Sequence, residues 1–303
     1  MNIQGENKAQ NRILGLLPLW LIIGIFMIGP LLVMAAVSLM ESNVYGGVHY
    51  KFSLLGYRQI LFDTNLFDEI EFNPAYLIII FRSFMLAIAA TFISFLIGFP
   101  AAFFISRQTN RVKNILIFLV TIPFWTNLLI RTFAWIIILG KGGVIENSFN
   151  FLGFIEDDES INLMYTNSAI LIGLVYSYLP LMVLPIYASL EKMDLRLLEA
   201  ATDLYSSRLE LIRKLILPLS LPGIIGGSIL VFVPCLGAFI APDLLGGGKK
   251  LLLGSLIQFQ FSYARNWSFG AAMAMFLLAL VIIILIFNAR VNKRHNEYEQ
   301  AKQ

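Results

Sequence analysis

The sequence predicts an all-α integral membrane protein with six transmembrane helices and both termini in the cytoplasm. Of its 303 residues, 58% are hydrophobic and only 14% carry a formal charge, and the mean hydropathy is +0.78. Soluble domains have about a quarter charged residues and slightly under half apolar ones. Six apolar stretches are long enough to cross a bilayer, and Lys and Arg are unevenly shared among the segments that connect them. A soluble globular protein of this length could not bury so much apolar surface in one core.

Each predicted span is an apolar run of about 20 residues or more, the length that a helix needs to cross the hydrocarbon core. The first run follows the basic residues Lys8 and Arg12. With about 28 residues it is far longer than the apolar part of a signal peptide, so we interpret it as an uncleaved anchor. The second run exceeds what a bilayer requires, which indicates tilt or a cytoplasmic extension. The predicted spans are 13–40, 75–106, 115–139, 168–190, 219–242 and 267–290.

The positions of Lys and Arg set the expected orientation of these spans. Fourteen of the 22 lie in the N-terminal segment, in the 107–113 and 191–218 loops and in the tail from Arg290 onward, whereas six lie in the other three loops. An excess of Lys and Arg marks cytoplasmic loops, so both termini are expected in the cytoplasm. Acidic residues gather instead in the predicted outer loops, at 63–71 and 156–159. Their clustering fits either the ordinary charge bias of membrane proteins or an anionic vestibule that concentrates a cationic solute.

The sequence carries no evident catalytic, metal-binding or nucleotide-binding set. One cysteine, Cys235, and two distant histidines, His49 and His295, cannot form a zinc site or a nucleophilic triad. The glycine- and lysine-rich run 246–250 lacks the spacing of a phosphate-binding loop. No carboxylate lies inside the six predicted spans, so a proton relay has no obvious carrier. We therefore expect a transport subunit and not an enzyme, with no cofactor and no metal bound by this chain.

Two arginines, Arg82 and Arg131, lie inside predicted spans. An arginine at mid-membrane costs about 2.5–3.5 kcal/mol. Both residues are expected in the outer third of the bilayer, where a long side chain can reach the interface or a polar group of a partner at lower cost. The segment from Pro123 to Arg131 places a proline, a Trp, an Asn and an Arg in one span. Because proline at membrane depth is tolerated where a helix lines a cavity or packs on protein, we expect this segment to face a pathway or a partner.

The 191–218 loop has the strongest pattern among the connecting segments. Apolar residues recur at helical spacing over 195–205, with Asp194 as an N-cap, and Ser207 with Glu210 forms a capping box that begins a second helix. This second helix is expected to end before Pro218. Its apolar side is formed by Leu209, Ile212, Leu215 and Ile216. Two short amphipathic helices fit either a groove on a soluble partner or the protein's own helical bundle, and the pattern alone leaves both open.

The same loop resembles the EAA loop of the permease subunits of binding-protein-dependent ABC importers. It has the motif's opening Glu-Ala-Ala and its Pro-terminated ending at the family spacing, but Tyr205 stands where the family usually has glycine. Tyrosine at positive φ would be strained, so the turn either uses ordinary dihedrals or has shifted to Ser206. By this resemblance, the residues that couple the chain to an ATPase are Glu199, Ala200, Ala201, Asp203, Tyr205, Leu215, Leu217 and Pro218.

The resemblance is not limited to the loop, because segments over roughly residues 75–290 are similar to those of spermidine/putrescine permeases. The matching segments are 123–127, 129–131, 173–176, 197–204, 221–225, 243–244 and 246–247. The resemblance implies the type I ABC importer permease fold. In that fold, residues 1–74 would hold the N-terminal tail, the first transmembrane helix and an outer loop. Residues 75–290 would form the five-helix transmembrane domain with its coupling loop, and 291–303 a cytoplasmic tail.

The resemblance also implies the partners of the chain. A second, PotC-like permease would form a heterodimer with it in the inner membrane, and two cytoplasmic ABC ATPase subunits would bind and hydrolyse the ATP. An external polyamine-binding protein and the lipid bilayer complete the set, with no nucleic acid. An importer permease for another small solute (an amino acid, a sugar or iron) is the alternative. A secondary transporter or a membrane enzyme would need inverted repeats, intramembrane carboxylates or a catalytic set, and none is evident.

A polyamine pathway requires aromatic faces for ammonium and methylene groups and a few carboxylates that bind without trapping. The candidates on this basis are Phe124, Trp125, Asn127, Tyr176, Tyr178 and Asp243. The alternative is that the aromatic rings are ordinary packing and that Asp243 caps a helix or pairs with Lys249. Arg131 would repel a cation unless it is turned away or neutralised.

Overall fold

The computed structural model describes residues 21–43, 45–64, 70–153, 163–193 and 207–300. These residues form helices and two short β-hairpins, and the chain divides into two compact units. Unit 1 joins the chain up to Pro74 with Ile257–Ile284, and unit 2 joins Ala75–Leu256 with the chain from Leu285. Within the described residues, six helical segments are long and apolar enough to span a membrane. They are Leu21–Ser38, Ala75–Ser106, Leu128–Phe151, Asn167–Glu191, Leu209–Gly237 and Trp267–Arg290.

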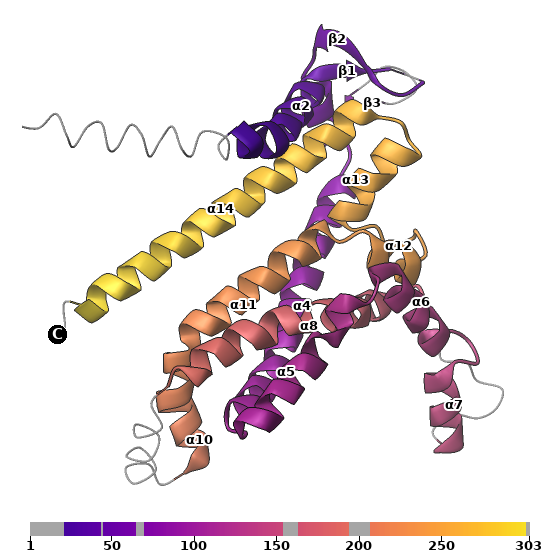
Figure 1. Cartoon of the computed structure of the whole chain (residues 1–303). Helices are drawn as coiled ribbons and strands as arrows, with labels where there is room; N and C mark the ends of the chain where they lie inside the picture. Colours follow the sequence, from indigo (N-terminus) through magenta and orange to yellow (C-terminus); the bar gives the residue numbers. More distant parts are fainter. Residues whose placement is uncertain (1–20, 44, 65–69, 154–162, 194–206, 301–303) are drawn as a thin grey trace, which may run out of the picture. The chain divides into compact units, whose positions relative to one another are not determined.

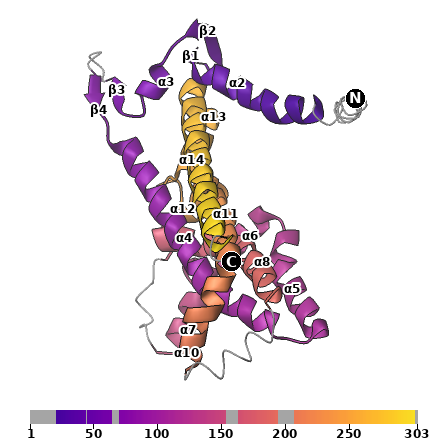
Figure 2. The same ribbon diagram turned by 90° about the vertical axis from the view of Figure 1, so that its left-hand side faces the viewer.

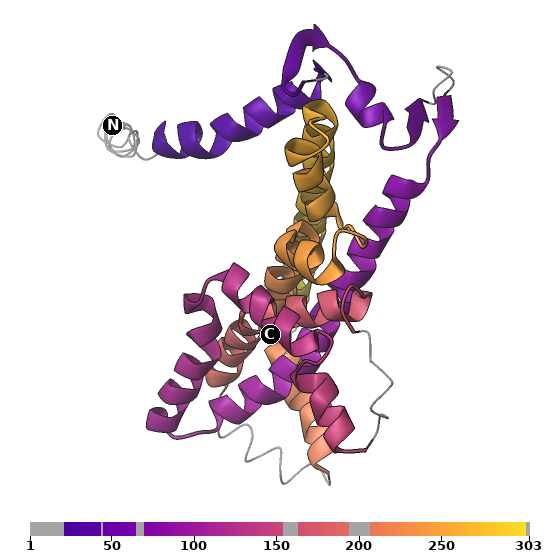
Figure 3. The same cartoon turned by 90° about the vertical axis from the view of Figure 1, so that its right-hand side faces the viewer.

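Unit 1 contains the first span and the two hairpins (Figure 3). Strands β1 and β2 pair antiparallel, with Glu41 opposite His49, and β3 pairs antiparallel with β4. The first hairpin turns through Gly46 and Gly47, which both have positive φ, a conformation that glycine adopts without steric cost. The elements are η1 (Gly24–Ile28), α2 (Gly29–Ser38), β1 (Met40–Ser42), β2 (Val48–Phe52), α3 (Leu55–Arg58), β3 (Phe62–Thr64) and β4 (Ile70–Phe72), with the end of α13 (Leu253–Ser262) and most of α14 (Trp267–Gln300).

Three long helices form the core of unit 2: α4 (Ala75–Ser106), α8 (Asn167–Glu191) and α11 (Leu217–Gly237). They lie side by side in Figure 1. Glycines allow the close approach, because a Cβ on Gly98 or on Gly227 would lie 3.0 Å from the Met182 side chain of α8. Small residues at such contacts are the usual means by which helices pack in a membrane, where lipid offers no hydrophobic drive for association.

The third predicted span, 115–139, is wrong as a single helix. The chain forms α5 (Asn110–Trp125) and α6 (Leu128–Leu139), and Thr126 and Asn127 between them are extended. The Oδ1 atom of Asn127 accepts a 2.8 Å hydrogen bond from the Leu129 amide and so caps α6. Hydropathy cannot detect such a cap, because the residues on both sides of it are equally apolar. α5 packs against α8 and α4 (Figure 2).

The candidate span Leu128–Phe151 extends beyond the predicted end at 139 and so includes a carboxylate. Glu146 belongs to α7 (Val144–Phe151), which follows α6 within the span Leu128–Phe151. Its side chain is 8% exposed, and its Oε2 accepts a 2.8 Å hydrogen bond from the Gly142 amide. The carboxylate therefore closes the turn between α6 and α7. It pairs the Gly142 amide, which would otherwise need another partner.

A buried side-chain bond ties the start of α13 to α4. The Oγ atom of Ser83 is 1% exposed at the residue level and accepts a 2.8 Å hydrogen bond from the Leu253 amide. The remaining elements of unit 2 are α10 (Arg208–Leu211), η2 (Ile212–Ile216) and α12 (Ile240–Gly246).

Candidate functional site

The predicted coupling loop falls partly outside the described residues. Glu199, Ala200, Ala201, Asp203 and Tyr205 lie there, and so does the helix predicted over 195–205.

The structure describes the second half of the loop, from Ser207. The Ser207 Oγ accepts a 3.3 Å hydrogen bond from the Glu210 amide, which is the N-cap contact of the predicted capping box. Glu210 also pairs with Lys214 at 3.1 Å, one helical turn on. The predicted start of this helix is confirmed.

The predicted end of this helix before Pro218 is wrong. α10 passes through the π-helical turn η2 directly into α11, and the Leu217 amide bonds to the Ile212 carbonyl five residues back. Proline lacks an N–H and its ring clashes with the carbonyl four residues earlier in a regular helix. The wider π turn sits at that position and accommodates Pro218 in the first turn of α11. The coupling segment is therefore continuous with the fifth span.

The buried side chains of this segment differ in part from those predicted to form its apolar side. Ile216 is fully buried and Leu211 is 8% exposed, whereas Leu209 is 76% exposed. Leu215 and Leu217 are half-buried and Pro218 is exposed. The isolated chain thus presents Leu209 at its surface, next to the acid–base pair of Glu210 and Lys214.

The end of α8 lies close to this segment within unit 2. Lys113, at the start of α5, forms a 3.2 Å ion pair with Glu191 at the end of α8. A groove of about 690 Å³ runs between the ends of α8 and α11. It is lined by Pro185, Ala188, Ser189, Lys192, Met193, Leu219, Pro222 and Gly223.

A second candidate region lies where α11 is interrupted, and Tyr178 is the predicted pathway residue that lines it. α11 ends at Gly237 and α12 begins at Ile240, and α12 packs against α6 and α8. A cavity of about 90 Å³ lies at this junction. It is lined by Leu128, Leu174, Ser177, Tyr178, Gly237, Ala238, Phe239, Ile240 and Ala241. The break at Ala238 and Phe239 directly follows the candidate span Leu209–Gly237, and residues of α6 and α8 line the cavity beside it.

Arg131 projects from α6 beside this junction. Its Nε and Nη1 atoms are buried and have no hydrogen-bond partner among the described residues. A buried guanidinium without a full set of acceptors is costly. Its positive charge would also repel a free cation that came close to it.

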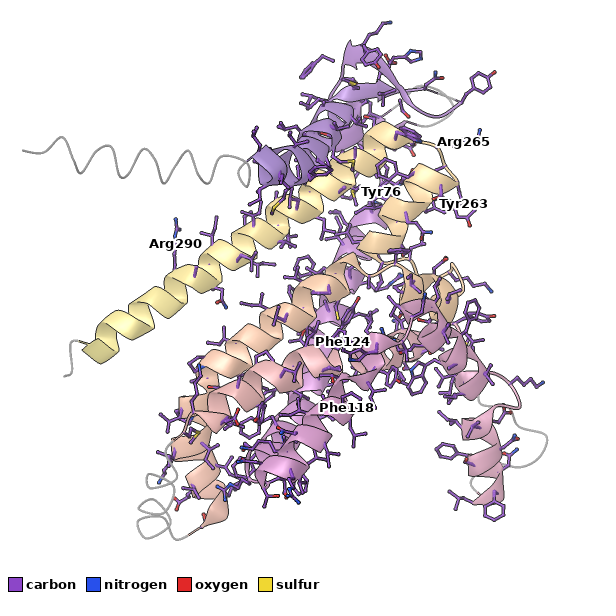
Figure 4. The ribbon with its side chains drawn as sticks, viewed as in Figure 1. Tyr76, Phe118, Phe124, Tyr263, Arg265 and Arg290 are labelled. Atoms are coloured by element: carbon purple, nitrogen blue, oxygen red, sulfur yellow. The ribbon has the colours of Figure 1, made fainter. Side chains whose placement is uncertain are left out.

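The structure brings only some of the predicted pathway residues together. Tyr178 lines the cavity, and the Tyr176 ring makes an edge contact with Trp135 at 5.5 Å between centroids. Phe124 and Trp125 lie at the end of α5, 43% and 82% exposed (Figure 4 labels Phe124). Their exposure leaves them free to face lipid or a partner.

The other two predicted pathway residues occupy helix starts. Asn127 caps α6, and Asp243 is exposed in the first turn of α12. The interruption at Ala238 and Phe239 and the buried Ser177 were not predicted. Gly237 and Pro242 on either side of the interruption are the sequence signal that could have indicated it.

The comparison with protein families identifies the class. Residues 94–296 match the model of the binding-protein-dependent transport system inner membrane component. The chain belongs to this family. Members are inner-membrane components by description, and this member has six apolar helices of spanning length among its described residues. It is a multi-pass protein of the inner membrane.

Relatives of this family member extend the match over nearly the whole chain. It is 38% identical over 291 residues to the spermidine/putrescine permease PotB of Haemophilus influenzae, covering 96% of both chains. It is 37% identical to PotB of Escherichia coli K12 (92% of this chain, 96% of the relative) and 35% identical to PotB of Salmonella typhimurium SL1344 (97% and 98%).

Solved structures support the fold of this family. A chain of a bacterial alginate ABC transporter, in complex with its alginate-bound periplasmic protein, matches with a TM-score of 0.71 at 15% identity over 97% of this chain and 98% of that one. A chain of the MetNI methionine ABC transporter matches with a TM-score of 0.51 at 17% identity, over 72% and 94%. The predicted importer permease fold is confirmed.

Proposed function

We propose that this chain is the permease subunit of an ATP-driven importer for polyamines such as spermidine and putrescine. The observation that carries the proposal is 35–38% identity to spermidine/putrescine permeases over nearly the full length of both chains. The matched region covers nearly the whole length of both chains, and the identity exceeds the 15–17% shared with the importers that match by fold.

In this function the chain supplies half of the translocation pathway and a contact for the motor. A second, PotC-like permease supplies the other half, two cytoplasmic ATPases bind and hydrolyse ATP, and an external binding protein delivers the polyamine. The segment that begins at Ser207 supports the coupling role, because it leads into the fifth span without a break. Exposed Leu209 offers an apolar contact to a soluble partner at this end.

The chemistry of the α6–α8–α12 junction is compatible with a linear polycation. The phenol of Tyr178 and the ring of Tyr176 offer aromatic faces for ammonium and methylene groups. Asp243 in α12 offers a carboxylate near the predicted outer surface. Arg131 at the same junction would keep a cation from resting there.

Uptake by proteoliposomes that contain the assembled complex tests this function. We expect uptake of labelled spermidine or putrescine that requires both ATP and the binding protein. Uptake driven by an ion gradient alone would overturn the permease class. ATP-dependent uptake of an amino acid, a sugar or iron, with no polyamine uptake, would retain the class and overturn the substrate.

The coupling role has its own test in Glu199→Lys. We expect the variant to insert into the membrane and to lose both stimulated ATP hydrolysis and uptake, because it reverses the charge at the centre of the ATPase contact. Lys51→Glu is the control, since it reverses an exposed charge of unit 1, outside the coupling loop. Normal transport by the Glu199→Lys variant would remove this loop from the mechanism.

The aromatic pathway is tested at Trp125, whose ring is 82% exposed in the isolated chain. Trp125→Ala should lower the maximal uptake rate more than Trp125→Phe, because phenylalanine retains a ring face for cation–π contact. Equal rates for the two variants would show that the ring does not face the substrate.

A further inference from the structure

Unit 1 contains a pocket of about 400 Å³ lined mainly by polar residues, a size within the usual range for ligand-binding sites. It lies between the first hairpin, α3 and the turn that joins α13 to α14 (Figure 4 labels Arg265 in this turn). The lining residues come from segments more than 200 positions apart in the sequence. They are Glu41, Ser42, Asn43, Leu55, Gly56, Gln59, Ala264, Arg265, Asn266 and Ser268.

Short hydrogen bonds hold the amide side chains of the pocket in place. The Asn266 amide nitrogen donates to Gln59 Oε1 at 3.1 Å, and Asn266 Oδ1 accepts from the Phe269 amide at 3.1 Å. Asn43 Oδ1 accepts from the Tyr45 amide at 3.3 Å. Each of the three side-chain carbonyl oxygens already accepts a bond from within the chain.

Apart from Glu41, the remaining polar side-chain groups of the pocket can donate hydrogen bonds, and its two hydroxyls can also accept them. The amide nitrogens of Asn43 and Gln59 and the hydroxyls of Ser42 and Ser268 can each donate. Both hydroxyls are buried and have no partner among the described residues, and Ser268 is only 3% exposed. A buried polar group without a partner is unusual in a folded protein and calls for an explanation.

Arg265 adds a fixed positive charge at the rim. Its φ of 55° places it in the left-handed region, which is uncommon for a residue other than glycine and tends to mark functional positions. The Arg265 side chain lies over the hairpin turn, since a Cβ on Gly46 would be 3.6 Å from its Cβ and Cδ. Glu41 is the single carboxylate that lines the pocket.

This inventory argues against the polyamine as occupant. A polyamine carries only N–H donors and positive charge, so it would leave the amide nitrogens of Asn43 and Gln59 unpaired and approach Arg265 unfavourably. A protein loop that presents an Asp or Glu side chain and backbone carbonyls would satisfy them. Its peptide N–H groups could in turn donate to Glu41.

The side of the membrane determines which protein can reach the pocket. Loops 41–74 and 243–266 are the first and fifth connections of a six-span chain, so they emerge opposite the fourth connection, the 191–218 coupling loop. If that loop meets the cytoplasmic ATPase, the pocket faces the outside. Resting on the proposed function, we infer that this pocket receives an acidic loop of the external polyamine-binding protein.

The test is the concentration of purified, polyamine-loaded binding protein that half-maximally stimulates ATP hydrolysis by the reconstituted complex. Arg265→Glu should raise this concentration about tenfold, because it places a carboxylate against the acidic loop. Lys51→Glu is the matched control, since Lys51 is an exposed cation of the same unit outside the pocket. It should change the concentration less than twofold.

Ser268→Ala provides an independent variant that keeps the packing volume. It should raise the half-maximal concentration about threefold, because one donated hydrogen bond is lost. Equal responses of the parent and both pocket variants would overturn the inference, and so would an equal rise in the Lys51→Glu control. A parent complex that the binding protein does not stimulate at all would instead overturn the proposed function.

Discussion

Replacing Gly223 with alanine places a single methyl group between α8 and α11. In the native packing, a Cβ at this position would lie 2.5 Å from the Pro185 carbonyl oxygen and 2.6 Å from the Ser189 Cβ. Both are backbone or first side-chain atoms of α8, so no flexible side chain can move aside to relieve the clash.

The size of the effect follows from these distances. Ordinary van der Waals contact begins near 3.4 Å, so α11 must move away from α8 by about 0.9 Å to admit the methyl group. A gap of that size forfeits about a quarter to a half of the dispersion attraction between the separated surfaces. Overpacking of this kind costs about 1–3 kcal/mol. At about 2–4 °C per kcal/mol, the Tm should fall by roughly 2–12 °C.

Two neighbouring glycines of α11 make the assay internally controlled. A Cβ on Gly226 would meet nothing within 4 Å, whereas one on Gly227 would lie 3.0–3.3 Å from atoms of Met182. Thermal unfolding of the purified complex in detergent should therefore rank Gly226→Ala as the most stable, Gly227→Ala as intermediate and Gly223→Ala as the least stable. Alanine at the open position should match or exceed the parent, because alanine has the higher helix propensity.

The ranking can fail in an informative way. If Gly223→Ala unfolds at or above the temperature of Gly226→Ala, the close approach of α8 and α11 does not exist in the native protein. The contact at Pro185 would then be discarded, together with the packing argument for the unit 2 core.

Three further predictions follow from hydrogen bonds and charge. Ser83→Ala should destabilise the protein by about 1–3 kcal/mol in thermal unfolding, because it leaves the buried Leu253 amide unpaired. Ser94→Ala should be neutral or stabilising, since the buried Ser94 hydroxyl has no partner among the described residues. The reverse order of stability would refute the hydrogen bond from Leu253 to Ser83. Asn127→Ala should cost about 1 kcal/mol of stability, because the cap of α6 is lost. Thr109→Ala should cost less, because the Thr109 side chain makes no capping bond to α5. Equal losses of stability would contradict the capping role of Asn127. Asp243→Asn should raise the polyamine concentration for half-maximal uptake, and unchanged uptake would place the pathway elsewhere.

Hydropathy alone predicted the membrane class and most of the spans. The second span, 75–106, and the sixth, 267–290, agree with the structure at both ends, because long apolar runs bounded by polar residues leave little choice of boundary. The prediction of the third span failed because a single side-chain cap at Asn127 interrupts an apolar run. The fifth extends back to Leu209, because a π turn accommodates Pro218 where a regular helix would end.

The unit 1 pocket and the α6–α8–α12 junction could not be predicted. Gln59 and Asn266 meet across more than 200 residues, and no local pattern signals such a pairing. The same holds for Tyr178, which the sequence singled out as an aromatic candidate but could not place against the interruption at Ala238. Burial patterns within one helix say which face is apolar and do not say which distant segment covers it.

The helix from Leu209 to Gly237 has the geometry of a lever with two arms. It spans 29 residues and is held tightly against α8 near its middle, at Gly223 and Gly227. With a rise of 1.5 Å per residue, the arm toward Leu209 is about 24 Å long and the arm toward Gly237 about 18 Å. A sideways push at the Leu209 end therefore swings the opposite end the other way, by about three quarters of the distance, if the helix does not bend. A force applied at the membrane surface would thus reach the interrupted segment at Ala238 through a pivot, with no relay of side chains between them.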